Sequence, residues 1–209
     1  MIERTNHALR CGALEPIRTE TRYLEERGIQ FIVRILAHLE RKTRTNKAQQ
    51  GARSDETCDP FLPYDKELFV AELSESHVCL LNKFNVVDHH LLIVTRAFEE
   101  QETLLNRKDF DALLPCMAEI DGLAFYNGEK AAGASQRHKH LQLVPLPLGP
   151  QAAPVPIEPL LGHAWFRRAW GEVPGLGFKH ALARLDPVGL RSRGRQQNCS
   201  EPIVPCWRR

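Results

Sequence analysis

Short apolar segments recur along this chain, and their spacing predicts several strands. From Ile29 to Ile35 apolar residues recur at every second position, which favours a strand over a helix. Two longer apolar runs, residues 77–82 and 89–95, are separated by a short connection, so they predict neighbouring antiparallel strands. Because apolarity in these two runs is continuous rather than alternating, we expect both of their faces to be buried.

A helix and two further strands are predicted after these runs. Apolar residues between Phe110 and Met117 have helical spacing, with Gly122 as the expected C-cap. Pro115 lies inside this pattern and should kink or shorten the helix. Strands are predicted at residues 123–127 and 138–146, with a loop of small residues between them. The expected class is α+β, with a helix laid across antiparallel strands.

The other segments are more polar or irregular. Residues 1–28 are mixed in character and are predicted to be partly helical. Residues 43–58 contain no large apolar side chain, which indicates a solvated loop. The segment 59–65 has two prolines around aromatic residues and should be extended rather than helical. Aromatic residues between positions 165 and 170 have near-helical spacing and are interpreted as core or interface residues.

Composition narrows the class of protein. The 209 residues carry a formal net charge of +2, so the balance does not indicate a nucleic-acid partner. No apolar run reaches the roughly 18 residues of a membrane span, and the first residues lack the features of a secretory signal. Six cysteines form no CxxC pair and are expected to be reduced thiols. Together these features predict a cytoplasmic protein without a membrane partner.

Charge is unevenly distributed, which suggests a boundary near the end of the chain. Residues 187–209 contain five arginines and one acidic residue, a net of +4, so the preceding residues carry a net of −2. We therefore predict two parts, a folded domain at 1–186 and an irregular basic tail at 187–209.

The clearest chemical content lies at the start of the predicted strand 138–146. Side chains two positions apart share one face of a strand at a spacing of about 7 Å, so His138, His140 and Gln142 would form a row. Such a row suits a phosphate group laid along the strand, and a neutral imidazole is a competent nucleophile near neutral pH. Just before it, the small residues 133–136 would let backbone N–H groups approach an anion.

The His-x-His pattern does not by itself specify a nucleophile. Such a pair can be incidental, or it can supply two metal ligands. The metal interpretation is weakened because no third obvious ligand stands nearby in the sequence and Gln142 would be a poor one. We therefore predict no metal site at the row.

The same residues carry a resemblance to a known family. His138-Lys-His-Leu-Gln142 resembles the His-x-His-x-Gln motif of the transferase branch of the histidine-triad superfamily. Residues 77–96, 110–126 and 133–136 extend the likeness, and from about residue 8 to about residue 186 the chain is similar to the diadenosine tetraphosphate phosphorylases, also called ATP adenylyltransferases. The resemblance implies an α+β fold, a histidine-triad-like antiparallel sheet with packed helices of the galactose-1-phosphate uridylyltransferase type.

A nucleotidyltransferase reaction with a covalent intermediate is implied by this resemblance. In that family the middle histidine, here His140, attacks a dinucleoside polyphosphate and releases ATP. Phosphate then splits the adenylyl-histidine to give ADP, and the reverse reaction makes the dinucleotide. The implied partners are diadenosine polyphosphates, ATP, ADP and phosphate. No tightly bound cofactor is implied, and Mg²⁺ would accompany the nucleotide.

The resemblance also implies roles in substrate binding. Gln142 would hydrogen-bond the transferring phosphate, and His138 would orient the site rather than attack. The polyphosphate would be cradled by Gly133, Ala134, Ser135 and Gln136. Further substrate contacts would come from Lys42, Asn82, Lys83 and Asn127.

Several of these residues could equally serve a purely structural role. Asn82 and Lys83 could merely form a turn, and Asn127 could close the end of its strand. His89 and His90 precede a buried strand and are interpreted as structural rather than catalytic.

The end of the chain leaves the activity open. The likeness stops after residue 186, where the family's sequences continue, so the chain is interpreted as C-terminally truncated. One alternative is therefore an inactive, truncated nucleotide-binding remnant. The other is a histidine-triad dinucleoside polyphosphate hydrolase. Gln142 favours transfer, because a neutral amide cannot act as a base for water.

Overall fold

The computed structural model describes residues 1–26, 28–36, 59–150 and 154–185. Its contacts divide the chain into two compact units, residues 1–164 and residues 165–209, which are described separately. The predicted boundary after residue 186 concerns residues beyond the described ones and stays a prediction.

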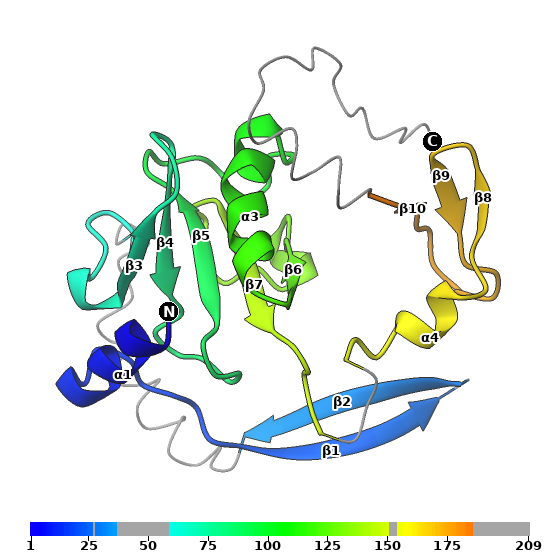
Figure 1. Cartoon of the computed structure of the whole chain (residues 1–209), viewed down its shortest axis with the longest axis horizontal. Helices are drawn as coiled ribbons and strands as arrows, with labels where there is room; N and C mark the ends of the chain where they lie inside the picture. The colour runs from blue at the N-terminus through cyan, green and yellow to red at the C-terminus, as the bar shows by residue number, and fades with distance from the viewer. Residues whose placement is uncertain (27, 37–58, 151–153, 186–209) are drawn as a thin grey trace. The chain divides into compact units, whose positions relative to one another are not determined.

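A five-stranded antiparallel sheet forms the centre of the first unit (Figure 1). Its order is β3 (Phe69–Glu72), β4 (His77–Leu81), β5 (Leu91–Thr95), β7 (His140–Pro145) and β6 (Gly122–Phe125). β4 and β5 pair antiparallel and are buried along their whole length, as the continuous apolar runs predict. The strand expected from residue 138 begins two residues later, and His138 forms an isolated bridge with Glu100 instead.

One face of this sheet packs against the helices α3 (Arg107–Glu119) and α1 (Ile2–Cys11), as Figure 1 shows for α3. Alternate residues of β4, β5 and β7 meet the buried side of α3, Ala8 of α1 and Leu14 after that helix in one cluster. The members of this cluster include Ala8, Leu14, Cys79, Ile93, Ala112, Leu113, Leu141 and Leu143. The predicted helix across the strands is therefore confirmed.

The opposite face of the sheet is covered by the segment before β3. Phe61 and Tyr64 pack there against the alternate residues of β4 and β5, Val78, Leu80, Leu92 and Val94. This segment leads into the short 3₁₀ helix η1 (Lys66–Leu68), whose first turn is capped by the Asp65 carboxylate accepting from the Glu67 N–H at 2.9 Å. The extended conformation expected for residues 59–65 is wrong for residues 60–63, which form a turn in which the Leu62 N–H donates to the Asp59 carbonyl at 3.3 Å. The segment covers the sheet face on which the histidine row lies.

For α3, the expected C-cap at Gly122 was wrong, and Pro115 does not shorten the helix. The helix continues past Pro115 to Glu119 rather than ending there, because the carbonyl that loses its partner belongs to Asp111, on an exposed position. Ile120, in an extended conformation, is the C-cap. Gly122 instead starts β6, where a Cβ would lie 2.8 Å from both the Leu143 side chain and the Val144 carbonyl oxygen.

A separate two-stranded sheet is formed by β1 (Thr19–Glu26) and β2 (Ile29–Leu36). The strand expected at Ile29 to Ile35 is confirmed, whereas a strand at 19–26 was not predicted. The Arg34 guanidinium donates to the Leu148 carbonyl at 2.8 Å, so the hairpin is tied to the segment that follows β7. This places the hairpin beside one end of the five-stranded sheet.

The remaining short elements are η2 (Lys130–Ala132) and α4 (Glu158–Leu161) in the first unit, and β8 (Trp165–Arg167), β9 (Trp170–Glu172) and β10 (Leu182–Ala183) in the second. Near-helical aromatic spacing at 165–170 thus belongs to a hairpin, in which Trp165 and Trp170 are about half exposed, at 45% and 50%. Across the described ranges, no helix combines the length and apolarity needed to cross a membrane.

Candidate active site

The histidine row lies on the sheet face opposite α3. His138 and His140 both contact the Phe61 ring, with ring centroids 5.5 and 5.4 Å away. Lys139, between them, faces the helix side, where its ammonium donates to Asp109 at 2.8 Å. The alternation of a strand therefore separates the two imidazoles from the lysine, as the sequence predicts.

His140 is held in a single tautomer. Its Nδ1–H donates to the His138 carbonyl oxygen at 2.8 Å, so the lone pair of the ring is on Nε2. The residue is only 4% exposed, and burial lowers the pKa of its imidazole below 6.5, against the opposing effect of the His138 carbonyl. The ring is thus neutral near pH 7, which is the state in which a histidine can attack phosphorus.

His138 is engaged at both ring nitrogens. Nδ1 lies 2.6 Å from the Asp59 carboxylate, and Nε2 lies 2.7 Å from the Thr95 carbonyl oxygen. The Thr95 hydroxyl also lies 2.9 Å from Nε2 and can donate to it, so both ring nitrogens are engaged within the protein. This arrangement suits the supporting role expected for His138 and leaves His140 as the nucleophile of the pair.

Gln142 is oriented by a relay of polar side chains. The Asn82 amide donates to His90 Nδ1 at 3.2 Å, and His90 Nε2–H donates to the Gln142 Oε1 at 3.1 Å. Burial lowers the pKa of His90 to about 4, so the ring is neutral and carries the single proton that this relay requires. Because the amide oxygen of Gln142 is occupied, its NH₂ group is the end available to a phosphate oxygen.

The backbone of His140 is clamped by Gln101. The Gln101 Oε1 accepts the His140 N–H at 2.8 Å, while its Nε2 donates to the Asn127 carbonyl at 2.8 Å and to the His140 carbonyl at 3.2 Å. Gln101 is 2% exposed. One buried amide therefore holds the ends of β7 and β6 together and fixes Asn127 close to the nucleophile.

The loop of small residues lies close to the side chain of Asn127, whose backbone carbonyl accepts from Gln101. A Cβ on Gly133, whose φ is +96°, would lie 3.6 Å from the Asn127 side-chain nitrogen. The N–H groups of Gly133 and Ala134 donate to the Lys130 and Glu129 carbonyls at 3.0 and 3.1 Å. These two amides are used within the loop, so their predicted contact with phosphate would require the loop to rearrange. Ser135 is exposed and Gln136 half-buried.

Of the two lysines among the predicted residues, the structure describes Lys83, and it is not brought to the row. The Lys83 ammonium is 42% exposed and pairs with the Glu15 carboxylate at 3.3 Å. Its neighbour Asn82 instead takes part in the relay described above. Lys42 lies outside the described residues, and its predicted contact stays a prediction.

An apolar cavity adjoins the relay. Its volume is about 220 Å³, and His90 forms part of its wall. The other walls come from β2, β6, β7, the segment after β7 and the loop before β5, namely Ile32, Arg34, Val86, Val87, Leu123, Phe125, Val144 and Leu148. A largely aliphatic and aromatic cavity beside a few oriented polar groups is typical of a small-molecule site.

Sequence reasoning did not identify four residues that build this site. Asp59, Phe61 and Gln101 were given no role, and His90 was interpreted as structural, although it orients Gln142. The sequence feature that could have pointed to this segment is the pair of prolines around Phe61. It indicated a fixed conformation but not which face of the sheet the segment covers. Within the described residues, the row itself does not gather three metal ligands, whereas His7, Cys11 and Glu67 do.

The antiparallel sheet under α3, with its His-x-His-x-Gln row on one face, defines an α+β protein of the histidine-triad-like class. The sequence model of the Ap4A phosphorylase N-terminal domain matches residues 1–163. The chain therefore belongs to this family.

Two curated proteins of Saccharomyces cerevisiae are similar to the chain. Diadenosine 5',5'''-P1,P4-tetraphosphate phosphorylase 2 is 31% identical over 156 residues, which are 67% of this chain and 47% of that protein. Protein APA1 is 27% identical over 150 residues, 65% of this chain and 45% of that protein. The chain thus spans about half the length of the curated relatives it matches.

Solved structures of a yeast protein are also similar to the chain. Yeast Ap4A phosphorylase Apa2 in complex with AMP has a TM-score of 0.54 and 27% identity, over 68% of this chain and 48% of that one. The same enzyme in complex with Ap4A has a TM-score of 0.53 and 25% identity, over 70% and 50%. The histidine-triad-like fold expected from the sequence is therefore confirmed.

Proposed function

We propose that this chain is a nucleotidyltransferase that carries out the phosphorolysis of diadenosine tetraphosphate to ATP and ADP, and the reverse reaction. The observation that carries the proposal is the tautomer of His140, because Nδ1–H donation to the His138 carbonyl leaves Nε2 as the nucleophile. The family match and the relatives that act on this dinucleotide support the choice of substrate.

The reaction has two displacements at one phosphorus atom. The His140 Nε2 attacks the α-phosphorus, an N–P bond forms, and the P–O bond to the rest of the chain breaks to release ATP. An oxygen of inorganic phosphate then attacks the same phosphorus, the N–P bond breaks, and ADP leaves. The Gln142 NH₂ donates to a phosphate oxygen in both steps, which holds the transferring group against the neutral imidazole.

We propose that the rest of the nucleotide binds beside the histidine row. An adenine base fits the apolar cavity beside His90, and Asn127, with residues 133–136, reaches the polyphosphate. We propose that ATP, ADP, phosphate and diadenosine polyphosphates are the partners, that the nucleotide brings Mg²⁺ with it, and that the protein needs no tightly bound cofactor. A cytoplasmic location without nucleic-acid or membrane partners completes the proposal.

Covalent labelling of the purified chain tests this function. Diadenosine tetraphosphate labelled at the α-phosphates should leave an acid-labile, alkali-stable adenylyl group that is absent from His140→Ala. His163→Ala, which changes an exposed histidine outside the site, should label as the unaltered chain does. Equal labelling of His140→Ala would contradict the assignment of the nucleophile.

The acceptor is tested by adding phosphate to the labelled protein. Transfer predicts that ADP is released only when phosphate is present. Release of AMP without phosphate would show a hydrolase, and nucleotide binding without any labelling would show an inactive binding protein. Either result would overturn the proposed reaction.

A further inference from the structure

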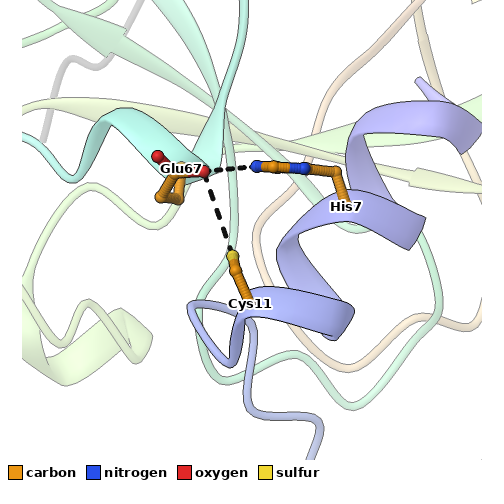
Figure 2. A group of neighbouring side chains, drawn as sticks. All are labelled: His7, Cys11 and Glu67. Carbon is orange, nitrogen blue, oxygen red and sulfur yellow. Dashed lines mark hydrogen bonds and ion pairs between the residues drawn. The ribbon is translucent and has the colours of Figure 1, made fainter.

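A second group of reactive side chains lies outside the histidine row. His7 and Cys11 of α1 point toward Glu67 of η1, as Figure 2 shows. The group offers one imidazole nitrogen, one thiol sulfur and one carboxylate oxygen, and these three atoms all lie within 4.8 Å of one another. The histidine and the carboxylate are in direct contact, and the Cys11 sulfur lies 3.9 Å from the Glu67 Oε2.

The protein holds these side chains in place through their backbones. His7 and Cys11 are four residues apart in a helix, so they occupy the same face one turn apart. The Arg4 guanidinium joins this helix to the segment that carries Glu67, with Nε donating to the Phe69 carbonyl at 2.7 Å and Nη2 donating to the Lys66 carbonyl at 3.3 Å. The three ligand atoms therefore converge from two elements that are already docked on each other.

We propose that His7, Cys11 and Glu67 bind a divalent metal ion of the zinc class, with water as the fourth ligand. Bonds of 2.0–2.3 Å to a tetrahedral ion put ligand atoms about 3.5 Å apart, which small side-chain rotations reach from the present separations. A thiolate and a carboxylate neutralise the charge of the ion, and thiolate with imidazole favours zinc over magnesium or calcium.

The three side chains are accessible to solvent, so a metal ion can reach them from solution. The side chains of His7 and Glu67 are 43% and 50% exposed, and Cys11 is exposed. An ion bound here would bridge α1 to the segment that leads into the edge strand β3. The site thus fastens the N-terminal helix to the sheet, and it is independent of the proposed transfer reaction.

Cobalt spectroscopy provides the test, because Co²⁺ reports both its geometry and a thiolate ligand. The full-length chain would carry Cys58→Ser, Cys199→Ser and Cys206→Ser, which removes the thiols outside the described residues. Titration should saturate at one equivalent, with a thiolate-to-cobalt charge-transfer band and the intense visible bands of four coordination. Zinc should then displace the cobalt.

Single-ligand variants separate this site from adventitious binding. Cys11→Ser should abolish the charge-transfer band, and His7→Ala and Glu67→Gln should each weaken Zn²⁺ binding by about tenfold or more. His163→Ala and Glu75→Gln, which change exposed residues of the same kinds elsewhere, should bind as the parent does. Charge transfer that survives Cys11→Ser, or equal Zn²⁺ affinity in the site and control variants, would overturn the proposal.

Discussion

The reactivity of His140 is set by two local features, its burial and the donor bond to the His138 carbonyl. Burial lowers the pKa of the ring, so the neutral nucleophile persists below pH 6.5. The phosphates of the dinucleotide do not titrate near neutrality, and a rate profile therefore reports the enzyme. We expect the single-turnover labelling rate to reach half of its maximum at a pH below 6.5. A half-maximal rate at or above pH 6.5 would contradict the burial argument.

Among the residues around the nucleophile that have no chemical role, Gln101 is the one whose substitution we expect to lower stability most. Gln101→Leu has a similar shape but leaves the buried His140 N–H and Asn127 carbonyl without this partner. Unpaired buried groups cost about 1–3 kcal/mol each, so the free energy of unfolding should fall by about 2–6 kcal/mol. Urea denaturation measures the loss. Gln30→Leu, at a half-buried glutamine of β2, is the control and should change stability by less than about 1 kcal/mol.

At the scale of the elements, α3 is joined to the sheet by a buried charged network. Lys139 donates to Asp109 at 2.8 Å and to the Leu104 carbonyl at 3.1 Å, while the other Asp109 oxygen lies 3.1 Å from His77 Nε2. Burial alone would raise the pKa of the Asp109 carboxyl, but hydrogen bonds with His77, Lys139 and the Asn106 N–H together lower it. The carboxylate is thus ionised in a place where no water can replace a lost partner.

Removing Lys139 and Asp109 together should cost less than the sum of the two single losses. Lys139→Met leaves the Asp109 charge without its ammonium and should lower the free energy of unfolding by about 3–5 kcal/mol. Adding Asp109→Asn removes the uncompensated charge, so the double variant should lose less than the sum of the single ones. Denaturant unfolding of all four proteins measures the coupling. Additive losses would show that the pair does not act as a unit.

The strands of the central sheet could be predicted because a strand buried on both faces has a continuous run of apolar residues in its sequence. β4 and β5 are the clearest cases. β1 has no such run of apolar residues. Six of its eight residues are exposed, and it is held by pairing with β2 rather than by an apolar face. A mostly exposed strand that is held by backbone pairing therefore has no apolar pattern from which it could be predicted.

The same distinction applies to the candidate site. The row of His138, His140 and Gln142 follows from alternation within one strand, so it could be predicted. Asp59 and Gln101 come from segments 79 and 39 residues before the histidines that they contact. Neither has a neighbour in sequence that marks it as functional. Only the packing of the segment before β3, and of the loop after β5, brings them to the row.

At the scale of the whole molecule, the partners described for the row all lie within residues 1–164, which form one compact unit. A fragment of residues 1–164 should therefore label at His140 to within about threefold of the full chain, because removing contacts made elsewhere leaves the site unchanged. Circular dichroism would confirm that the fragment is folded before labelling is compared. A folded fragment without labelling would show that residues 165–209 contribute to the reaction.

The stability of the whole fold should also depend on pH through His90. Its pKa is about 4 in the folded chain against 6.5 in an unfolded one, so between these values the unfolded chain binds more protons. The free energy of unfolding should consequently fall as the pH drops from 6.5 to 4, by about 3 kcal/mol from this residue. Protonation would also place an N–H of His90 against the Asn82 amide, which is itself a donor.

Comparison with His90→Gln isolates this contribution, because other groups titrate equally in both proteins. Above pH 6.5 the two stability curves should run parallel, since His90 is neutral in both folded and unfolded chains there. Below that value the parent should lose stability faster, so that the gap between the curves narrows toward pH 4. Urea unfolding at intervals between pH 4 and 8 measures both curves. Curves that stay parallel throughout would mean that His90 is not buried in its neutral form, and the orientation of Gln142 would then need another cause.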